Sequence, residues 1–473
     1  MRKGIWLLFA VWLIILSPSA LAVSYESYTY DYYGNISSMP APYSPTESFT
    51  GNADIGSFAQ PSDFFIAEDG RIYLCDTGNH RIVVLNQSFQ TIEIIAGYSF
   101  QGEGRGFSNP QGIYGANGLL YVADTGNRRV VAVRRHAAGT WQAEFIIEAP
   151  ASELLPDNFV FSPVKVIADK AGRVYVIGAN VLEGLMYFDN NQQFMGYFGT
   201  IKVEVTIADW IWRQFATKEQ RSKMMLFVPT EFTNFDIDDD GFIFTTEVGT
   251  IERQSVKRLN PSGLDVLKNY SQYDILGDLI YLSSGGISSF VDIKAHSHGG
   301  YTVLDGTRGR IFTYDAEGAL LYVFAGMGTE LGLFQRPVAI DSYGNSLFVL
   351  DQARGAIIRF NATEYGRRIN EAIFARFNGE DELAEESWRA VLKLNAGYEP
   401  AYAGIGKSML NAGDNRGAVE YLQRGMDKRY YSIALRRFRN EQLKEWAPYI
   451  GAAFVVLAGC VVLRRVKRRK GHE

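Results

Sequence analysis

Cysteine is nearly absent from this chain of 473 residues, which contains only Cys75 and Cys460. Two cysteines cannot build the disulfide framework of a small secreted domain, and they cannot supply a zinc site made of several thiolates. The chain is long enough to bury a large apolar core instead. We therefore expect core packing, without disulfides, to stabilise the fold.

Histidine is also scarce, with five residues in the whole chain. His296 and His298 fall on the same side of an expected strand, as the histidines of a metal site do, but the sequence offers no convincing third ligand. A polar turn accounts for both. The chain also lacks a Gly-rich phosphate loop and a nucleophile elbow. The sequence therefore predicts no catalytic residue, no metal and no cofactor.

Positive charge is in short supply outside the two ends of the chain. The net charge is −5, and between Val23 and Leu463 there are 39 basic and 51 acidic residues, a balance of about −12. Because affinity for nucleic acids depends largely on neutralising phosphates, this balance argues against a nucleic-acid partner.

Two apolar segments lie at the ends of the chain. Residues 1–22 combine Arg2 and Lys3 with an apolar run and a small-residue cleavage site, which predicts a secretory signal peptide; an uncleaved anchor is the alternative. Residues 447–463 carry no charge, and the tail 464–473 is basic. This order predicts a single transmembrane helix in the cell membrane, with the N-terminal domain outside the cytosol and the C-terminus inside.

A sequence unit recurs six times along the middle of the chain. Each copy has a short apolar strand, a polar turn with glycine, a β-rich strand, a second turn and another strand. The copies span Phe58–Asn86, Phe107–Arg135, Phe161–Asp189, Phe227–Asn260, Ile287–Asp315 and Phe334–Asn361. Several strands in a period of about 40–50 residues predict the blades of a β-propeller.

Two copies carry a more specific signature. "PSDFFIAEDGRIYLCDTGNHRIVVL" and "PQGIYGANGLLYVADTGNRRVVAV" resemble NHL repeats. The resemblance implies an all-β six-bladed propeller of the NHL type over residues 55–365. Within the N-terminal segment 23–54, Tyr28–Gly34 is similar to Phe312–Gly318, and we expect it to supply the outermost strand that the sixth copy lacks, closing the ring.

In several copies an aspartate ends the second strand and an arginine opens the third. The pairs are Asp76/Arg81, Asp124/Arg129 and Asp305/Arg310. Their repetition favours ion pairs that brace the hairpins over a catalytic ring. In the first turn we expect Gly78 and Asn79 to take the positive-φ positions.

One segment between the third and fourth copies departs from the β pattern. Thr217 and Gln220 form a capping box, so residues 206–227 are predicted to form a helical insertion. Connections at this point of a propeller usually line the ligand-bearing face. The candidate partner-binding residues are Trp210, Trp212, Met224 and Met225. Packing of these side chains onto the propeller is the alternative.

A helical pattern follows the last copy. Three positions recur 34 residues later, with Gly379 repeated as Gly413, Ala384 as Ala418 and Trp388 as Leu422. This period is typical of tetratricopeptide repeats, so we interpret residues 366–430 as two TPR-like repeats. Residues 431–446 are expected to form a linker helix that leads into the membrane span.

The stretch "DIDDDGFIFTTE" (Asp236–Glu247) has the spacing of a helix–loop–helix calcium site. Aligned with "FIAEDGRIYLCD" (Phe65–Asp76), however, it places Asp240 and Gly241 in the turn between the first two strands of a blade. Glu247 then ends the second strand. We therefore interpret the stretch as the hairpin of the fourth blade.

The predicted function is that of a membrane-anchored extracytoplasmic scaffold that binds a protein or an envelope ligand through the propeller and the TPR-like repeats. Two alternatives stay open. One is an exported metal-dependent lactonase- or lyase-like enzyme, because some propellers that resemble NHL units hold a metal in the channel on histidines from several blades; this chain has few suitably placed histidines. The other is a carbohydrate-binding accessory of a sugar-uptake system.

Overall fold

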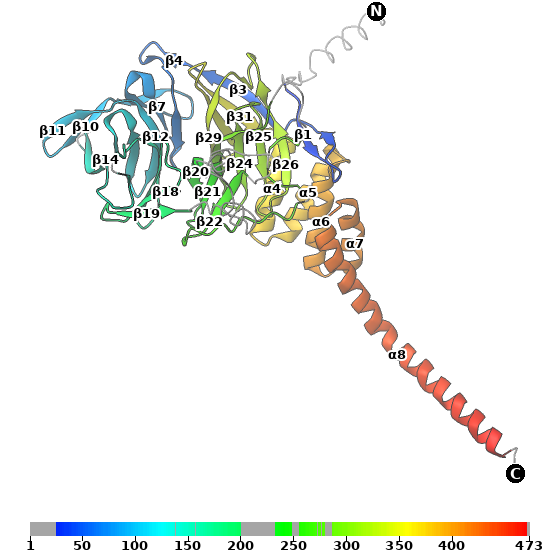
Figure 1. Cartoon of the computed structure of the whole chain (residues 1–473). Coiled ribbons are helices and arrows are strands. Elements are labelled where there is room, and N and C mark those ends of the chain that lie inside the picture. The colour runs from blue at the N-terminus through cyan, green and yellow to red at the C-terminus, as the bar shows by residue number, and fades with distance from the viewer. Residues whose placement is uncertain are drawn as a thin grey trace, which may run out of the picture.

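The computed structural model describes residues 25–137, 139–156, 158–199, 232–247, 255–271, 273–275, 277–279 and 286–470. Six β-sheets are arranged around a central axis, and the innermost strand of each sheet contacts that of the next around a closed ring. The fold is a six-bladed β-propeller followed by helices (Figure 1), as the sequence repeats predicted.

Each blade holds one of the repeated units, with its strands numbered outward from the axis. Blade 1 contains β6 (Asp63–Ile66), β7 (Ile72–Asp76), β8 (Arg81–Leu85) and β9 (Thr91–Ile95). Blade 2 contains β12 (Pro110–Ala116), β13 (Leu119–Asp124), β14 (Arg129–Arg135) and β15 (Trp141–Ile147), extended by the hairpin β10 (Gly97–Phe100) and β11 (Glu103–Gly106). Blade 3 contains β16 (Pro163–Ala168), β17 (Val174–Gly178), β18 (Leu185–Phe188) and β19 (Phe194–Phe198).

The other three blades are less uniform. Within the described residues, blade 4 contains β20 (Phe232–Ile237), β21 (Ile243–Glu247) and β22 (Val256–Leu259). Blade 5 contains β23 (Phe290–Ala295), β24 (Tyr301–Asp305), β25 (Ile311–Tyr314) and β26 (Leu320–Phe324), extended by β1 (Tyr28–Tyr30) and β2 (Ile36–Ser38). Blade 6 contains β29 (Pro337–Tyr343), β30 (Ser346–Asp351), β31 (Ala356–Ala362) and β3 (Tyr43–Phe49). Short pairs are β4 (Gly51–Asn52) with β5 (Gly56–Ser57) and β27 (Gly326–Met327) with β28 (Leu333–Phe334).

The N-terminal segment closes the ring with a different strand from the one we expected. β3 pairs antiparallel with β31 from Tyr43↔Ala362 to Phe49↔Ile357 and so completes blade 6. The predicted strand β1 instead pairs with β26 at the outer edge of blade 5. Pro45 of β3 lies at a register shift in an outermost strand, where a missing backbone N–H is tolerated. The prediction for Tyr28–Gly34 is therefore wrong, although the closing strand does come from the N-terminal segment.

Five helices follow blade 6. They are α4 (Glu364–Phe377), α5 (Asp381–Leu394), α6 (Glu399–Ala412), α7 (Asn415–Arg424) and α8 (Lys428–Lys470). The Thr363 side chain caps α4 by accepting a hydrogen bond from Gly366 N, and Gly413, with φ of 88°, ends α6. Apolar residues of α4, α5 and α6 share one core with blades 5 and 6. Tyr398 ties this core together, because its hydroxyl donates to Leu321 O over 2.7 Å.

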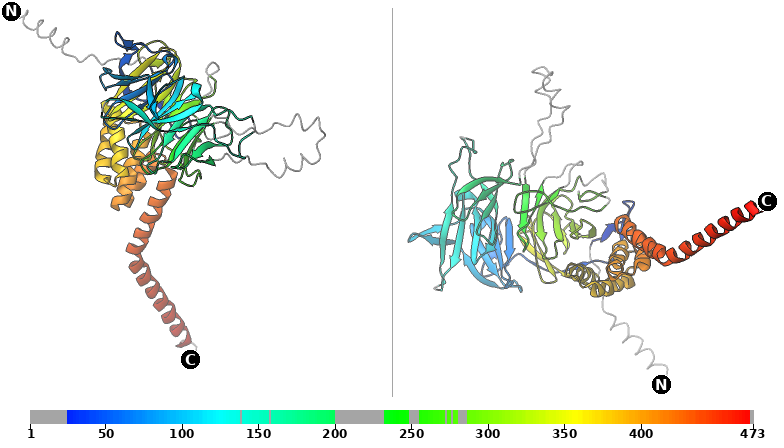
Figure 2. Two further views of the ribbon diagram at one scale, coloured as in Figure 1. Left: turned by 90° about the vertical axis from the view of Figure 1, so that its left-hand side faces the viewer. Right: turned by 90° about the horizontal axis from the view of Figure 1, so that it is seen from below.

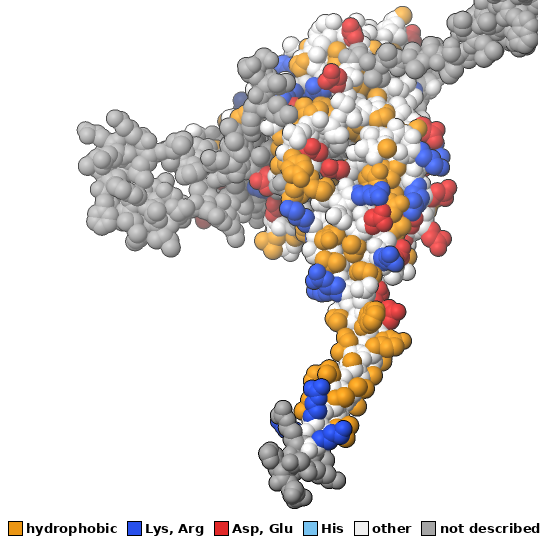
Figure 3. All heavy atoms as spheres, turned by 90° about the vertical axis from the view of Figure 1, so that its right-hand side faces the viewer, with side chains coloured by type: hydrophobic (Ala, Val, Ile, Leu, Met, Phe, Trp, Pro, Cys, Tyr) orange, Lys and Arg blue, Asp and Glu red, His pale blue; other side chains and the backbone are white. Residues whose placement is uncertain are grey.

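Helix α8 leaves the other helices and extends away from the propeller (Figure 2). Its segment Lys428–Arg465 contains a stretch of 18 residues with a mean hydropathy of 2.0, so the helix is long and apolar enough to cross a membrane, and other parts of the protein do not cover this stretch. Hydrophobic side chains cover its distal half and Lys and Arg side chains lie near its end (Figure 3). Pro448 lies inside this helix, where it removes one backbone hydrogen bond.

Candidate functional site

Charged side chains fill the central channel of the propeller. On one level, Lys165 Nζ of β16 lies 2.7 Å from Asp63 Oδ1 of β6. On the next level, Lys294 Nζ of β23 lies 2.8 Å from Asp341 Oδ1 and 3.2 Å from Asp236 Oδ2. The free space left among these residues is about 40 Å³, close to the volume of a single water molecule.

The channel carboxylates also join neighbouring blades. Asp63 Oδ2 accepts from Ile113 N of blade 2, and Asp341 Oδ2 accepts from Ile66 N of blade 1. Asp236 Oδ2 accepts from Ala295 N of blade 5, and Asp292 Oδ2 accepts from Ile340 N of blade 6. These bonds satisfy backbone groups of the inner strands, so the carboxylates connect adjacent blades as well as binding the lysines.

Burial raises the pKa values of several aspartate side chains in the channel. It raises the pKa of the Asp292 carboxyl to about 8; the nearby Lys165 opposes this rise and the negative charge of Asp63 adds to it. Burial also raises the pKa values of Asp63 and Asp236. Because Lys165 lies against Asp63, it compensates one carboxylate, and Asp292 keeps its proton near neutral pH.

Two of the predicted Asp/Arg pairs come together at the hairpins of blades 1 and 2. Asp76 Oδ2 lies 2.8 Å from Arg81 Nε, and Asp124 Oδ2 lies 2.9 Å from Arg129 Nε. Both aspartates are completely buried. Their other carboxylate oxygens accept from the backbone of the preceding segment, at Ala59 N and Ser108 N. This geometry is consistent with the predicted bracing of the hairpins.

The positive-φ positions of these turns differ from our expectation. His80 (φ 55°) and Arg128 (φ 56°) take the left-handed conformation, in place of Gly78 and Asn79. Glycine is needed at position 78 for another reason: a Cβ there would lie 2.8 Å from Ala59 O. Close approach of the backbone, rather than φ, therefore selects this glycine.

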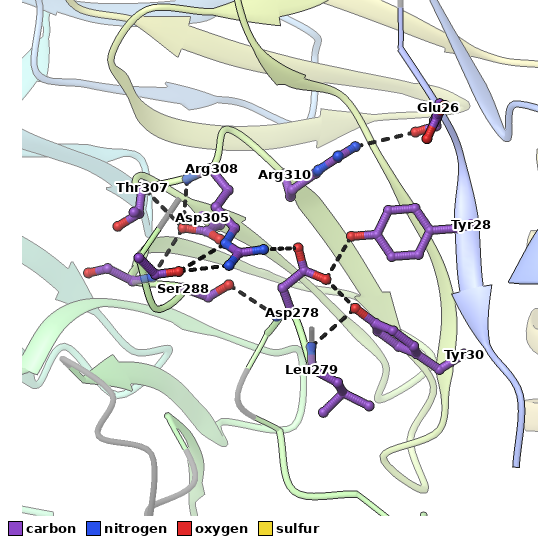
Figure 4. A network of polar contacts seen from close by, with 12 residues as sticks. Glu26, Tyr28, Tyr30, Asp278, Leu279, Ser288, Asp305, Thr307, Arg308 and Arg310 are labelled. Carbon is purple, nitrogen blue, oxygen red and sulfur yellow. Dashed lines mark hydrogen bonds and ion pairs between the residues drawn. The ribbon is translucent and has the colours of Figure 1, made fainter. Parts of the chain in front are cut away.

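The third predicted pair does not form. Arg310 Nη1 donates to Ala325 O over 2.8 Å, and its guanidinium lies 5.3 Å from the centre of the Tyr28 ring. Asp305 instead accepts from the backbone N–H groups of Ser289 and of Thr307, the second of which is labelled in Figure 4. Because β1 pairs with β26, Tyr28 lies beside Arg310. This aromatic neighbour could not be predicted from the repeat alone.

Asp278 anchors β1 to blade 5 in the same region. Its Oδ1 accepts hydrogen bonds from the hydroxyls of Tyr28 and Tyr30, and its Oδ2 lies 2.6 Å from Arg308 Nη1 (Figure 4). Tyr30 also accepts from Leu279 N. The alternating tyrosines of this strand therefore serve attachment to blade 5.

The stretch Asp236–Glu247 forms the predicted hairpin between β20 and β21. Asp238 Oδ1 accepts from Phe242 N in the turn, and its Oδ2 lies 2.8 Å from Arg258 Nη2. Glu247 stands opposite Phe232, at the far end of the hairpin from the turn, and binds Lys257. Three carboxylates of the apparent calcium spacing, those of Asp236, Asp238 and Glu247, thus form ion pairs with side chains of the protein.

His296 and His298 lie in the turn between β23 and β24, with ring centres 5.2 Å apart. His296 Nε2 is 2.8 Å from Thr302 Oγ1, and His298 Nδ1 accepts from Gly300 N. Burial lowers the pKa of His298 to about 4 and that of His296 well below its usual value. Among the residues that the structure describes, no group of three or more His, Cys, Asp and Glu side chains could hold a metal ion.

Two large cavities lie where the propeller meets the helices. The first, which we call the funnel, has a volume of about 590 Å³ and lies between the turns at one end of the channel and helix α4. Its lining includes Phe65, Glu68, Tyr114, Asp236, Asp239, Lys294, His296, Glu371 and Phe374. Its floor is thus continuous with the ion pairs of the channel.

The second cavity, which we call the groove, has a volume of about 800 Å³ and lies between blade 5 and the helices α4 to α8. Its lining includes Tyr32, Tyr270, Tyr273, Glu317, Phe377, Trp388, Lys407 and Arg429. Lys407 of α6 lies 2.7 Å from Glu317 of blade 5 and 3.2 Å from Asp427, just before α8. The groove and the funnel share His298, Leu321 and Ile373 in their walls.

Residues 58–85 match the NHL repeat family. The chain carries an NHL repeat in its first blade. Among solved structures, the propeller is similar to virginiamycin B lyase from Staphylococcus aureus (10% identity, TM-score 0.41, covering 65% of this chain and 97% of that one). It is also similar to a streptogramin B lyase (14%, 0.40, 72% and 87%) and to the allergen Mala s 1 of Malassezia sympodialis (12%, 0.41, 64% and 92%). No curated protein matches the chain.

The predicted partner-binding residues Trp210, Trp212, Met224 and Met225 lie outside the residues that the structure describes. The channel and the cavities were not predicted from the sequence. Polar residues in otherwise apolar inner strands were a usable signal for the channel, as in Lys165 of "PVKVIA" and Asp292 of "FVDIKA". The cavities had no comparable signal, because strands and helices far apart in the sequence build them.

Proposed function

We propose that this protein is a membrane-anchored, extracytoplasmic binding protein whose partner, a protein or an envelope ligand, engages the funnel and the groove. The proposal rests chiefly on the contrast between the filled channel and the two cavities at the helix junction. The channel leaves about 40 Å³ of free space, whereas the cavities at the helix junction offer about 590 and 800 Å³. Pockets of this size suit ligands and partner side chains.

Exposed aromatic side chains on α4 support a protein partner. Phe374 in the funnel is 48% exposed, and Phe377 in the groove is 53% exposed. Aromatic anchors beside a cavity are typical of the energetic centres of protein interfaces. Leaving both rings in water is costly unless another surface covers them.

The position of the cavities relative to α8 supports a partner at the membrane surface. Residues 428–446 precede the apolar stretch and are helical. At about 1.5 Å per residue they span about 27 Å, so the groove would lie within a small domain's width of the membrane. The basic residues after the apolar stretch support a cytoplasmic C-terminus, with the propeller outside the cytosol. We propose that α4 to α7 act as the TPR-like stalk, since α5 and α7 begin 34 residues apart.

Carbohydrate binding is a second candidate, because tyrosines line the groove. However, the Lys428 ammonium lies 4.5 Å from the centre of the Tyr32 ring, and the Arg429 guanidinium lies 3.5 Å from that of Tyr270. One face of each ring is therefore already covered, which leaves less surface for sugar stacking and favours the protein partner.

Photo-crosslinking of the full chain in its membrane tests the proposal. A benzophenone amino acid is introduced at Phe377 and, separately, at Phe374, with Met195 on blade 3, which is 57% exposed, as the control position. We expect both cavity positions to form an adduct with the same protein, identified by mass spectrometry, and Met195 to form none. Equal adducts from all three positions, or no protein adduct from either phenylalanine, would refute the assignment.

A further inference from the structure

The funnel is acidic in its lining. Apart from the two histidines, its lining has one basic side chain, Lys294, and five carboxylic acid side chains: Glu68, Asp236, Asp238, Asp239 and Glu371. His296 and His298 add no positive charge, since burial lowers both pKa values below neutral pH. The cavity therefore presents excess negative charge toward any occupant.

Some of this charge is already compensated by protein groups. Asp238 pairs with Arg258, and Glu371 lies 2.7 Å from Arg367. At the floor, a single lysine lies between Asp236 and Asp341. Burial raises the pKa of Asp236 and so disfavours its charged form, and a second cation beside it would stabilise that form.

Two acidic side chains at the rim form no ion pair within the described residues. Glu68, in the first turn of blade 1, and Asp239, in the corresponding turn of blade 4, are both exposed and line the funnel. In the described part of the chain neither carboxylate accepts a hydrogen bond, and Lys170 Nζ donates to the backbone oxygen of Asp239 over 2.6 Å. They stand on blades 1 and 4, so they approach the funnel from different sides.

Aromatic rings accompany these charges. Phe65 and Tyr114 pack with ring centres 5.2 Å apart at the floor, and half-exposed Phe374 lies on the wall formed by α4. Aromatic faces attract ammonium and guanidinium groups, and the attraction is larger where water is partly excluded. Carboxylates with aromatic rings in one cavity form an environment for an organic cation.

We propose that the funnel receives a basic side chain, a lysine or an arginine, presented by the partner polypeptide. This inference rests on the proposed function and specifies the chemistry of its partner. A polypeptide is favoured over a free amine because the funnel shares walls with the groove, so a chain anchored by one cation could continue along α4 past Phe377. Arginine and aromatic anchors are the usual energetic centres of such contacts.

The test measures binding of synthetic hexapeptides to the purified full chain in detergent micelles. Three peptide pools are random except for a central lysine, arginine or norleucine, which has a similar length and no charge. We expect the lysine and arginine pools to bind at least tenfold more tightly than the norleucine pool, and about 0.5 M salt to reduce this difference. Equal binding of the three pools, or no binding of any, would overturn the inference.

Matched variants locate the site. In Glu68→Gln/Asp239→Asn we expect the affinity for the basic pools to fall at least fivefold, while Asp54→Asn/Glu382→Gln, which removes two exposed charges outside the cavities, retains it. Unchanged binding by the funnel variant would overturn the inference.

Spermidine serves as a free amine. If spermidine bound the protein as tightly as the peptides do, the ligand would not need to be a polypeptide. Crosslinking at Phe377 is independent of these outcomes, so the proposed function can survive if the charge assignment fails.

Discussion

The channel and the funnel lie on the same axis and are built from the same residue types, but they differ in how their charges are balanced. In the channel, Lys165 and Lys294 each lie within 3.2 Å of a carboxylate, and little free space remains. In the funnel, Glu68 and Asp239 face about 590 Å³ of space. The comparison indicates that a charge cluster is structural where its members compensate one another, and is a candidate for binding where they do not.

The largest expected effect comes from breaking the balance of the channel. In Lys165→Met, the Asp63 carboxylate loses its cation while remaining buried, so we expect the free energy of unfolding at pH 8 to fall by about 3–5 kcal/mol. Denaturant unfolding of the full chain, followed by fluorescence, measures the change. Lys393→Met removes an exposed lysine of α5 and should change stability by less than about 0.5 kcal/mol. Similar values for both variants would contradict the structural role of the channel lysine.

The pH dependence of stability probes the same cluster. Folded Asp292 keeps its proton up to about pH 8, whereas the unfolded carboxyl has a pKa of about 4. The folded state therefore binds more protons between these values, and the free energy of unfolding falls as pH rises through this window. We expect Asp292→Asn to remove about 3–4 kcal/mol of the fall between about pH 5 and pH 8, since one proton per molecule corresponds to about 1.4 kcal/mol per pH unit.

Urea unfolding at several pH values checks this prediction, with Asp54→Asn as the exposed control. The relevant quantity is the slope with pH and not the stability at one pH, because asparagine also changes the hydrogen bonds to Ile293 N and Ile340 N. Parallel profiles for wild type and Asp292→Asn would show that this carboxyl is ionised throughout.

The propeller could be predicted from the sequence because its information is local and repeated. A turn with Asp240 and Gly241 aligns with one containing Asp69 and Gly70, and both form the same hairpin. The register of a blade follows from such turns and from alternating apolar residues. This is why the apparent calcium spacing could be assigned correctly to a hairpin.

Features that depend on contacts between distant segments could not be predicted in the same way. Tyr28–Gly34 resembles an outer strand, yet β3 takes that place in blade 6, because pairing is decided by the whole edge and not by a short pattern. Arg310 has the sequence position of a bracing arginine, but the neighbouring Tyr28 and Ala325 O offer it other contacts. The cavities combine turns of several blades with helices that follow much later in the chain.

A smaller effect on stability is expected at the groove. Lys407 connects α6 to Glu317 of blade 5 and to Asp427. Its side chain is as buried as that of Lys165, but its carboxylate partners are more exposed, at 24% and 19% against 11% for Asp63. We expect Lys407→Met to lower the free energy of unfolding by about 1–2 kcal/mol, because partly hydrated carboxylates recover some interaction with water. Denaturant unfolding is the measurement, again beside Lys393→Met. If Lys407→Met lowered the free energy of unfolding as much as Lys165→Met, the ion pairs of the groove would have the same structural role as those of the channel.

The smallest effect is expected in the funnel, where it is most informative. Glu68 and Asp239 are exposed and lack counterions within the described residues, so Glu68→Gln/Asp239→Asn removes no stabilising partner. We expect its free energy of unfolding to stay within about 0.5 kcal/mol of wild type. The same variant should lose at least fivefold in affinity for the basic peptides. A large loss of stability would mean that these carboxylates support the fold, and the distinction between a balanced channel and an unbalanced funnel would then no longer hold.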